Sequence, residues 1–330
     1  MAGHYPRLRS TVQSGDEVTL ILGVYSNWHA IQVSDRMVSL AGRQPVPYDT
    51  LANKTIVYFG RRGIVTIGYT GPAYIKGVPT DKWVAQTLSG LDLSTSGTAF
   101  GVRICRSFDI GQAIEHLRCE ATKIVGKPGA RLLEFHIIGS QWDRKHLRLR
   151  PVICKVTNKR TGGTTFEKLS VPRNWPIHRG YYFLLAGSGT DEARNHMRKQ
   201  FQLSGGPQSP EHCIDVMIEA IRHISGRIPS IVGPDCMAVH IQGGSPKVSI
   251  YFKPQFEYKV RHNSNGPWNG PLAFSPYLIS PNMVSQPSIS TNNMFLSTPD
   301  VDVRFEGGPQ LPIDQMPAMQ SHQRRPAPPS

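Results

Sequence analysis

The chain has 330 residues, of which 39% are hydrophobic and 18% charged, a balance that excludes a disordered polar chain and allows a buried core. The sequence contains no run of about 18 apolar residues, and its polar N-terminus lacks the apolar stretch of a secretory signal. Lysine and arginine exceed aspartate and glutamate by 14, so contact with polyanions has to be considered. Five scattered cysteines without CxxC or Cys/His spacing predict reduced thiols, no metal site and a cytoplasmic location.

The first part of the chain has the pattern of β-strands. Residues 18–24, 30–34, 54–59 and 64–69 are rich in apolar and β-branched residues. The last two of these stretches flank Gly60-Arg61-Arg62-Gly63, which predicts a hairpin with a short glycine-containing turn.

Helices and further strands are expected to follow in blocks. Apolar residues recur at helical spacing over about 80–91 and 109–124, and again over 191–201 and after the Ser209-Pro210 start signal. Further strands are predicted at 135–138, 151–156, 181–185, 236–241 and 248–252.

This order favours an α+β fold. Strands cluster in hairpins and do not alternate singly with helices, which argues against a doubly wound parallel sheet. Two antiparallel sheets packed face to face, each covered outside by a helix pair, would account for the order and for the continuous apolar strands. We therefore expect a four-layer αββα sandwich.

The chain divides by composition into four segments. Residues 261–330 hold 12 of the 27 prolines and show no helical period. We expect a flexible arm at 1–17, one domain at 18–255, an extended Pro/Ser-rich wrapping segment at 256–308 and a disordered tail at 309–330.

Three stretches of the strand region carry a resemblance to a known family. They are TLILGV, then IQVSDR, then NKTIVYFGRRGIVTIGYTG, and together they resemble a proteasome β-type subunit of the N-terminal-nucleophile (Ntn) hydrolase superfamily, as a distant bacterial-type relative. In that family a nucleophilic Thr opens the first strand, an Asp ends the second and a Lys opens the third, and here Thr19, Asp35 and Lys54 hold those places. Ser188, in the Ala186-Gly187-Ser188-Gly189 run, matches a family turn whose Ser lies near the nucleophile.

The resemblance implies amide or peptide hydrolysis without a cofactor. A Thr hydroxyl needs a base within hydrogen-bond reach, and the α-amine of a newly exposed Thr19 would supply it. Lys54, held by Asp35, would keep that amine largely neutral, and a backbone N–H would hold the oxyanion.

The sequence departs from the family pattern at three points. Val18 stands before Thr19, where self-cleaving members usually have Gly, and its branched side chain crowds the bond to be cut. The family's Asp-x-Arg pattern reads Asp35-Arg36-Met37, so its Arg is missing. Active members also have a late Asp and Ser that flank the nucleophile and would fall around residues 227–232. That stretch contains no Asp, and only its Ser230 could replace the Ser. A catalytically inactive subunit that serves in self-association, as a ring or dimer, therefore stays open as a second hypothesis.

Plainer interpretations apply to several of these residues. Asp35 is also interpretable as a structural carboxylate that pairs with Arg36, and His29, His136 and His240 as core or edge histidines without metal-ligand spacing. The basic stretch Asp143–Arg150 is typical of a charged turn entering a strand, without interleaved stacking aromatics. Nucleic-acid binding is the third and least favoured hypothesis.

Overall fold

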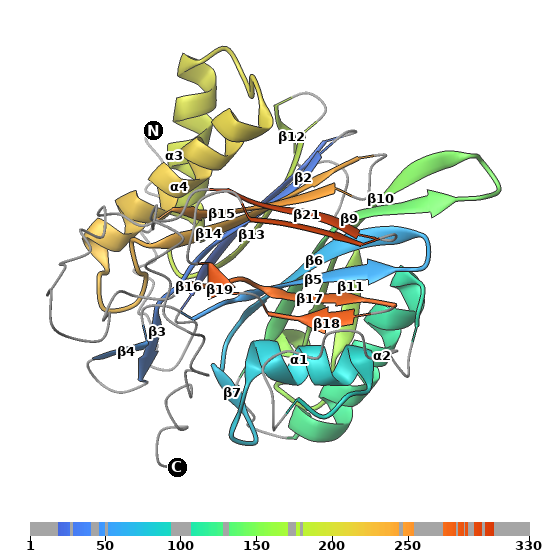
Figure 1. Cartoon of the computed structure of the whole chain (residues 1–330). Helices are drawn as coiled ribbons and strands as arrows, with labels where there is room; N and C mark the ends of the chain where they lie inside the picture. The colour runs from blue at the N-terminus through green and yellow to red at the C-terminus, as the bar shows by residue number, and fades with distance from the viewer. Residues whose placement is uncertain are drawn as a thin grey trace, which may run out of the picture.

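The computed structural model shows four α-helices and two main, mostly antiparallel β-sheets in its described residues (Figure 1). The helices are α1 Thr80–Ser89, α2 Ile110–Val125, α3 Thr190–Leu203 and α4 Pro210–Arg227. The structure describes residues 19–26, 29–40, 46–49, 52–93, 107–127, 132–170, 176–178, 181–243, 247–253, 273–281, 283–286, 288–289, 294–298 and 301–306. The expected arm at 1–17 and tail at 309–330 lie outside these residues.

The first main sheet is built around β1 and β2 and has the strand order β12-β13-β1-β2-β14-β15-β21-β20. Its pairs are antiparallel except β15 with β21, which run parallel. Its strands are β12 Pro176–His178, β13 Tyr181–Gly187, β1 Leu20–Tyr25, β2 His29–Asp35, β14 Cys236–Gln242, β15 Lys247–Lys253, β21 Val301–Glu306 and β20 Met294–Thr298.

The second main sheet is built around the predicted β5–β6 hairpin and has the order β11-β10-β9-β6-β5-β17-β18. Its strands are β11 Glu167–Ser170, β10 Arg148–Thr157, β9 Glu134–Asp143, β6 Gly63–Thr70, β5 Thr55–Gly60, β17 Tyr277–Ser280 and β18 Met283–Ser285. Short two-stranded pairs and one 3-10 turn complete the described elements: β3 Val38–Leu40 with β4 Val46–Asp49, β7 Tyr74–Ile75 with β8 Val78–Pro79, β16 Ala273–Phe274 with β19 Ser288–Ile289, and Lys159–Thr161.

Three groups of buried side chains hold these elements together. One joins α1 and α2 to the second sheet, for example through Leu117 and Phe135. Another joins α3 and α4 to the first sheet, for example through Met217 and Ile31. The third takes members from both sheets, among them Tyr25, Val57, Phe59, Ile138, Met237 and Ile250. Because the strands carry buried side chains on both faces, sequences such as that of β1 are apolar throughout.

The predicted helices and strands are present, with differences in length and number. The strands expected at 135–138 and 151–156 are the ten-residue strands β9 and β10, because they pair with each other along their whole length. Residues 277–306 were expected only as an extended segment. Their described parts add strands to both sheets, β17 beside β5 and β21 beside β15, where free strand edges supply hydrogen-bond partners.

Two further findings concern membrane-crossing helices and the cysteine thiols. Among the described residues, no helix has the length and apolarity needed to cross a membrane. The described cysteines, Cys119, Cys154, Cys213 and Cys236, are free thiols. Burial raises the pKa of Cys154 to about 11 and that of Cys213 to about 12, so these thiols are poor nucleophiles.

Candidate functional site

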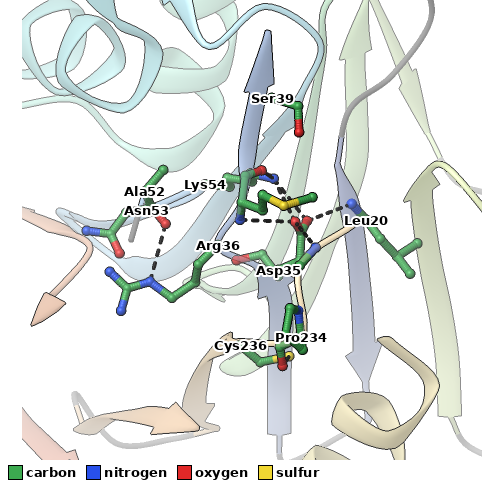
Figure 2. Close-up of polar contacts among 12 residues, drawn as sticks. Leu20, Asp35, Arg36, Ser39, Ala52, Asn53, Lys54, Pro234 and Cys236 are labelled. Carbon is green, nitrogen blue, oxygen red and sulfur yellow. Dashed lines mark hydrogen bonds and ion pairs between the residues drawn. The ribbon is translucent and has the colours of Figure 1, made fainter. Parts of the chain in front are cut away.

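Asp35 and Lys54 form a buried ion pair at the start of β1. The Lys54 Nζ atom lies 3.0 Å from Asp35 Oδ1 and 2.9 Å from Oδ2, and it also donates to the Met37 carbonyl (Figure 2). The same Asp35 Oδ1 accepts the backbone N–H of Leu20 at 2.8 Å. Thr19 immediately precedes Leu20 and is buried, with 3% of its surface exposed. The structure therefore brings Thr19, Asp35 and Lys54 to one place, although they are far apart in sequence.

The Asp35 carboxylate is fully enclosed and saturated with donors. Its Oδ2 atom accepts the backbone N–H groups of Met37 and Gly233, each at 3.2 Å. These contacts, with Leu20 and Lys54, replace the water that a carboxylate loses on burial. Burial lowers the pKa of Lys54, and the neighbouring Asp35 carboxylate partly offsets that effect. The pair thus ties β2, β5, the start of β1 and the loop before β14 to a single point.

Ser188 reaches this site through the backbone of its glycine-flanked turn. Gly187 is the register partner of Leu20, and the Ser188 N–H donates to the Thr19 carbonyl at 2.9 Å. A Cβ atom on Gly187 would lie 1.8 Å from the Thr19 carbonyl oxygen, and its φ of +97° is unfavourable for other residues. Glycine is therefore required there for the close approach of the two strands. The candidate residues Thr19, Asp35, Lys54 and Ser188 all lie within this one arrangement.

The loop after α4 contributes main-chain groups to the same site. The hydroxyl of Ser39, which lies two residues after Met37, donates to the Ser230 carbonyl at 2.7 Å. Gly233 packs so close to Met37 that a Cβ atom there would lie 2.7 Å from the Met37 Cβ. The loop after α4 therefore supplies backbone groups to this arrangement.

Arg36 packs against β15 and the segment before β5. It is fully buried, and its Nε donates to the Ala52 carbonyl at 3.3 Å (Figure 2). Its guanidinium lies 4.9 Å from the centroid of the Phe252 ring. Its backbone N–H donates to the Asp235 carbonyl at 3.0 Å. The Asp35 carboxylate forms an ion pair with Lys54.

A second polar cluster, which sequence reasoning missed, links the two main sheets. Glu134 Oε1 lies 2.7 Å from His136 Nε2 and 3.1 Å from Lys155 Nζ, and Lys155 also donates to the Leu185 carbonyl of β13 at 3.4 Å. Gln32 of β2 donates to the His136 carbonyl at 3.2 Å. Leu185 lies two residues before Gly187, so this cluster borders the Thr19 end of the first sheet.

The charges of that cluster are set by burial and pairing. Burial acts to raise the pKa of Glu134, but His136 and Lys155 outweigh it and hold that pKa at about 2. Burial lowers the pKa of His136, with Glu134 opposing the shift. Glu134 is therefore a buried carboxylate that stays ionised at neutral pH. Its partner Lys155 is 21 residues away in sequence, so only the β9–β10 register could have indicated the pair.

The other two histidines singled out by sequence contact each other and not the Thr19 site. His29 Nδ1 lies 2.9 Å from His240 Nε2, and burial lowers the pKa of His240 to about 4. In the part of the chain that the structure describes, no three His, Cys, Asp or Glu side chains gather in a way that could hold a metal ion.

The chemistry available at Thr19 depends on its peptide bond to Val18. While that bond is intact, the Thr19 nitrogen is an amide and cannot accept a proton from the hydroxyl. Sequence comparison gives no match to any protein-family model or curated protein. We therefore infer function from the residues around Thr19.

Proposed function

We propose that the chain is a threonine-type amide or peptide hydrolase of the Ntn class, related to proteasome β-type subunits and activated by cleavage of the Val18–Thr19 bond. The observation that carries the proposal is the Asp35–Lys54 ion pair, closed at 2.9 Å and bound through Asp35 to the N–H of Leu20. A lysine ammonium fixed beside the residue that opens a strand is the arrangement that an N-terminal Thr nucleophile requires.

The architecture supports the same proposal. One group of buried side chains lies between each helix pair and its sheet, and the third group takes members from both sheets. We infer that the sheets pack face to face with α1 and α2 outside one and α3 and α4 outside the other. Such an arrangement corresponds to the αββα sandwich of the Ntn class, with Thr19 proposed at one end of the layer between the sheets.

The proposed reaction uses groups of this chain alone. After cleavage, the free α-amine of Thr19 takes the proton of its own hydroxyl while Oγ attacks the substrate carbonyl carbon. The amine leaving group takes that proton as the C–N bond breaks, which leaves an acyl ester on Thr19. Water, deprotonated by the same α-amine, then releases the acid and restores the hydroxyl. The positive charge of Lys54 favours the neutral amine at the start of each step.

The mature N-terminus tests this proposal. Intact-mass measurement and N-terminal sequencing of the purified protein are expected to show a chain that begins at Thr19. Thr19→Ala is expected to remain uncut, whereas Thr19→Ser keeps a hydroxyl and is expected to be processed. A wild-type protein found only as the full-length chain, and unlabelled at Thr19 by a peptide boronate or β-lactone probe, would overturn the proposal.

A second candidate function is a non-catalytic binding or ring-assembly module. The observation that favours it is the burial of the site residues, since Thr19 is 3% exposed and Lys54 is 2% exposed. Lys54 also donates to both oxygens of Asp35 and to the Met37 carbonyl. Such an ion pair can simply anchor the start of β1. This candidate predicts an uncut chain that forms a dimer or ring in light scattering, and an uncut monomer would contradict it.

A further inference from the structure

The end of the second sheet opposite Lys54 carries a projecting, basic hairpin. β9 pairs with β6 only as far as Gln141, and beyond that point it pairs with β10 alone (Figure 1). From Glu134 to Asp143, β9 spans roughly 30 Å at about 3.4 Å per residue. The hairpin tip is thus well separated from the cluster that borders Thr19, and what it binds is independent of the chemistry proposed there.

Two turns join to form one surface at this end. The backbone N–H of Trp142 donates to the Arg62 carbonyl at 2.6 Å, so the β5–β6 turn lies against the β9–β10 hairpin. We call this surface the basic tip. Its exposed basic residues are Arg61, Arg62, Arg144, Lys145, Arg148 and Arg150.

The acidic residues of these segments leave most of that charge available. Asp143 forms ion pairs with Arg150 and, at 2.7 Å, with His146. Asp109 caps α2 by accepting the Gln112 N–H at 2.9 Å. With six basic side chains against these two carboxylates, the basic tip keeps a formal charge of +4.

Exposed apolar side chains lie on the same tip. Among the described residues, the large hydrophobic side chains that are exposed are Trp142 at 41%, Leu147 at 74% and Leu203 at 73%, and the first two belong to this hairpin. Trp142 is the cross-strand partner of Leu149. The partly exposed Trp142 indole therefore belongs to the same tip as the six basic side chains.

We propose that the basic tip binds single-stranded nucleic acid, with an unpaired base stacked on Trp142 and phosphates held by Arg62, Arg144 and Lys145. Stacking on an aromatic ring requires a base that is free of a duplex, and a cationic surface beside it follows the phosphate backbone. The stretch Asp143–Arg150 contains no stacking aromatic of its own. Trp142, the residue before it, supplies one, and its backbone N–H joins it to the Arg61-Arg62 turn.

Fluorescence anisotropy with a labelled 20-nucleotide oligo(U), titrated with the full-length chain at several salt concentrations, tests the proposal. Wild type is expected to bind, with affinity that falls steeply as salt rises. Trp142→Ala is expected to weaken binding about 10-fold at fixed salt, whereas Trp142→Phe keeps most of the affinity. The double variant R144A/K145A is expected to reduce the slope of log Kd against log salt by about 1.4, the value for two lost phosphate contacts.

Matched controls separate this site from general attraction to a basic protein. The double variant R198A/K199A removes the same charge from exposed positions on α3 and is expected to leave affinity and slope unchanged. Thr19→Ala is expected to bind like wild type, so failure of the hydrolase proposal would not affect this result. Four outcomes would overturn the proposal: no binding at 50 mM salt, equal loss in the α3 control, tighter binding to a duplex, or equal competition by polyglutamate.

Discussion

The two ends of β9 carry acidic side chains in opposite surroundings. Glu134, its first residue, is buried and lies within 3.1 Å of Lys155 and 3.9 Å of Lys159. Asp143, its last residue, lies at the hairpin tip with Arg150 and His146. Both pKa values are lowered, that of Glu134 against its burial and that of Asp143 chiefly by the hydrogen bond from His146. Similar pairing therefore serves a buried cluster at one end and a surface at the other.

The difference in burial determines what each end can do. Buried charges without partners are costly, so those at the Thr19 end must be held in fixed positions, which is a condition for chemistry. Exposed ion pairs contribute little to folding and exchange readily with water and ligands. In the two proposals above, the Thr19 end holds the nucleophile and the basic tip contacts the partner. This comparison predicts very different costs for changes at the two ends.

The largest expected effect is at Lys54. Lys54→Met leaves the fully buried Asp35 carboxylate without its ammonium, and breaking a buried pair in this way costs about 3–5 kcal/mol of unfolding free energy. Urea denaturation followed by circular dichroism measures this loss. The matched control is Lys123→Met, because Lys123 forms an exposed pair with Glu120 at 2.8 Å and should lose less than about 1 kcal/mol. A Lys54→Met loss as small as that of the control would contradict the contrast between buried and exposed pairs.

A smaller effect is expected from acid, and it should separate the two carboxylates of β9. The pKa of Glu134 is about 2 in the folded chain against 4.5 for the free side chain. Protons therefore bind the unfolded state first, so the stability from Glu134 is present above pH 4.5 and is lost as pH falls toward 2. A shift of this size corresponds to at most about 3 kcal/mol.

Substitution of each carboxylate tests that assignment. Glu134→Gln is expected to be less stable than wild type at pH 6, with the gap closing between pH 4.5 and 2. Asp143→Asn is expected to show a smaller gap that closes in the same direction, because the pKa of Asp143 is also lowered but its partners His146 and Arg150 are exposed at the hairpin tip, where solvent screens the pairs. Urea midpoints measured at intervals over this pH range give both curves. A gap for Glu134→Gln that stays constant with pH would show that Glu134 acts through packing and not through its charge.

The sequence was most informative where neighbours along the chain determine geometry. Thr19, Asp35 and Lys54 come together because each stands at the start or end of a strand whose apolar pattern is clear. Ser188 was indicated only by the resemblance of its glycine-flanked turn, between a strand and a helix, to the family turn. The α+β class and the order of the predicted helices and strands followed from the same local signals.

What the sequence could not supply depends on pairing between distant segments. The contact of Trp142 with Arg62 joins residues 80 apart, and it depends on the register of β6 with β9. The strands within 277–306 are short apolar patches in a proline-rich region, and they become strands only beside the edges of β5 and β15. Such pairings are fixed by the assembled sheets and leave little trace in any one segment.

The smallest expected effect is at the basic tip, and it completes the contrast. Arg144 and Lys145 are exposed, and replacing both with Ala should change the unfolding free energy by no more than about 0.5 kcal/mol. Arg150 is left intact because it pairs with Asp143. Urea denaturation of R144A/K145A beside the α3 variant R198A/K199A should give midpoints close to wild type for both. If R144A/K145A alone lost more than about 1 kcal/mol, its side chains would support the hairpin. Any loss of oligonucleotide binding would then reflect folding, whereas unchanged stability with reduced binding would assign these residues to the contact itself.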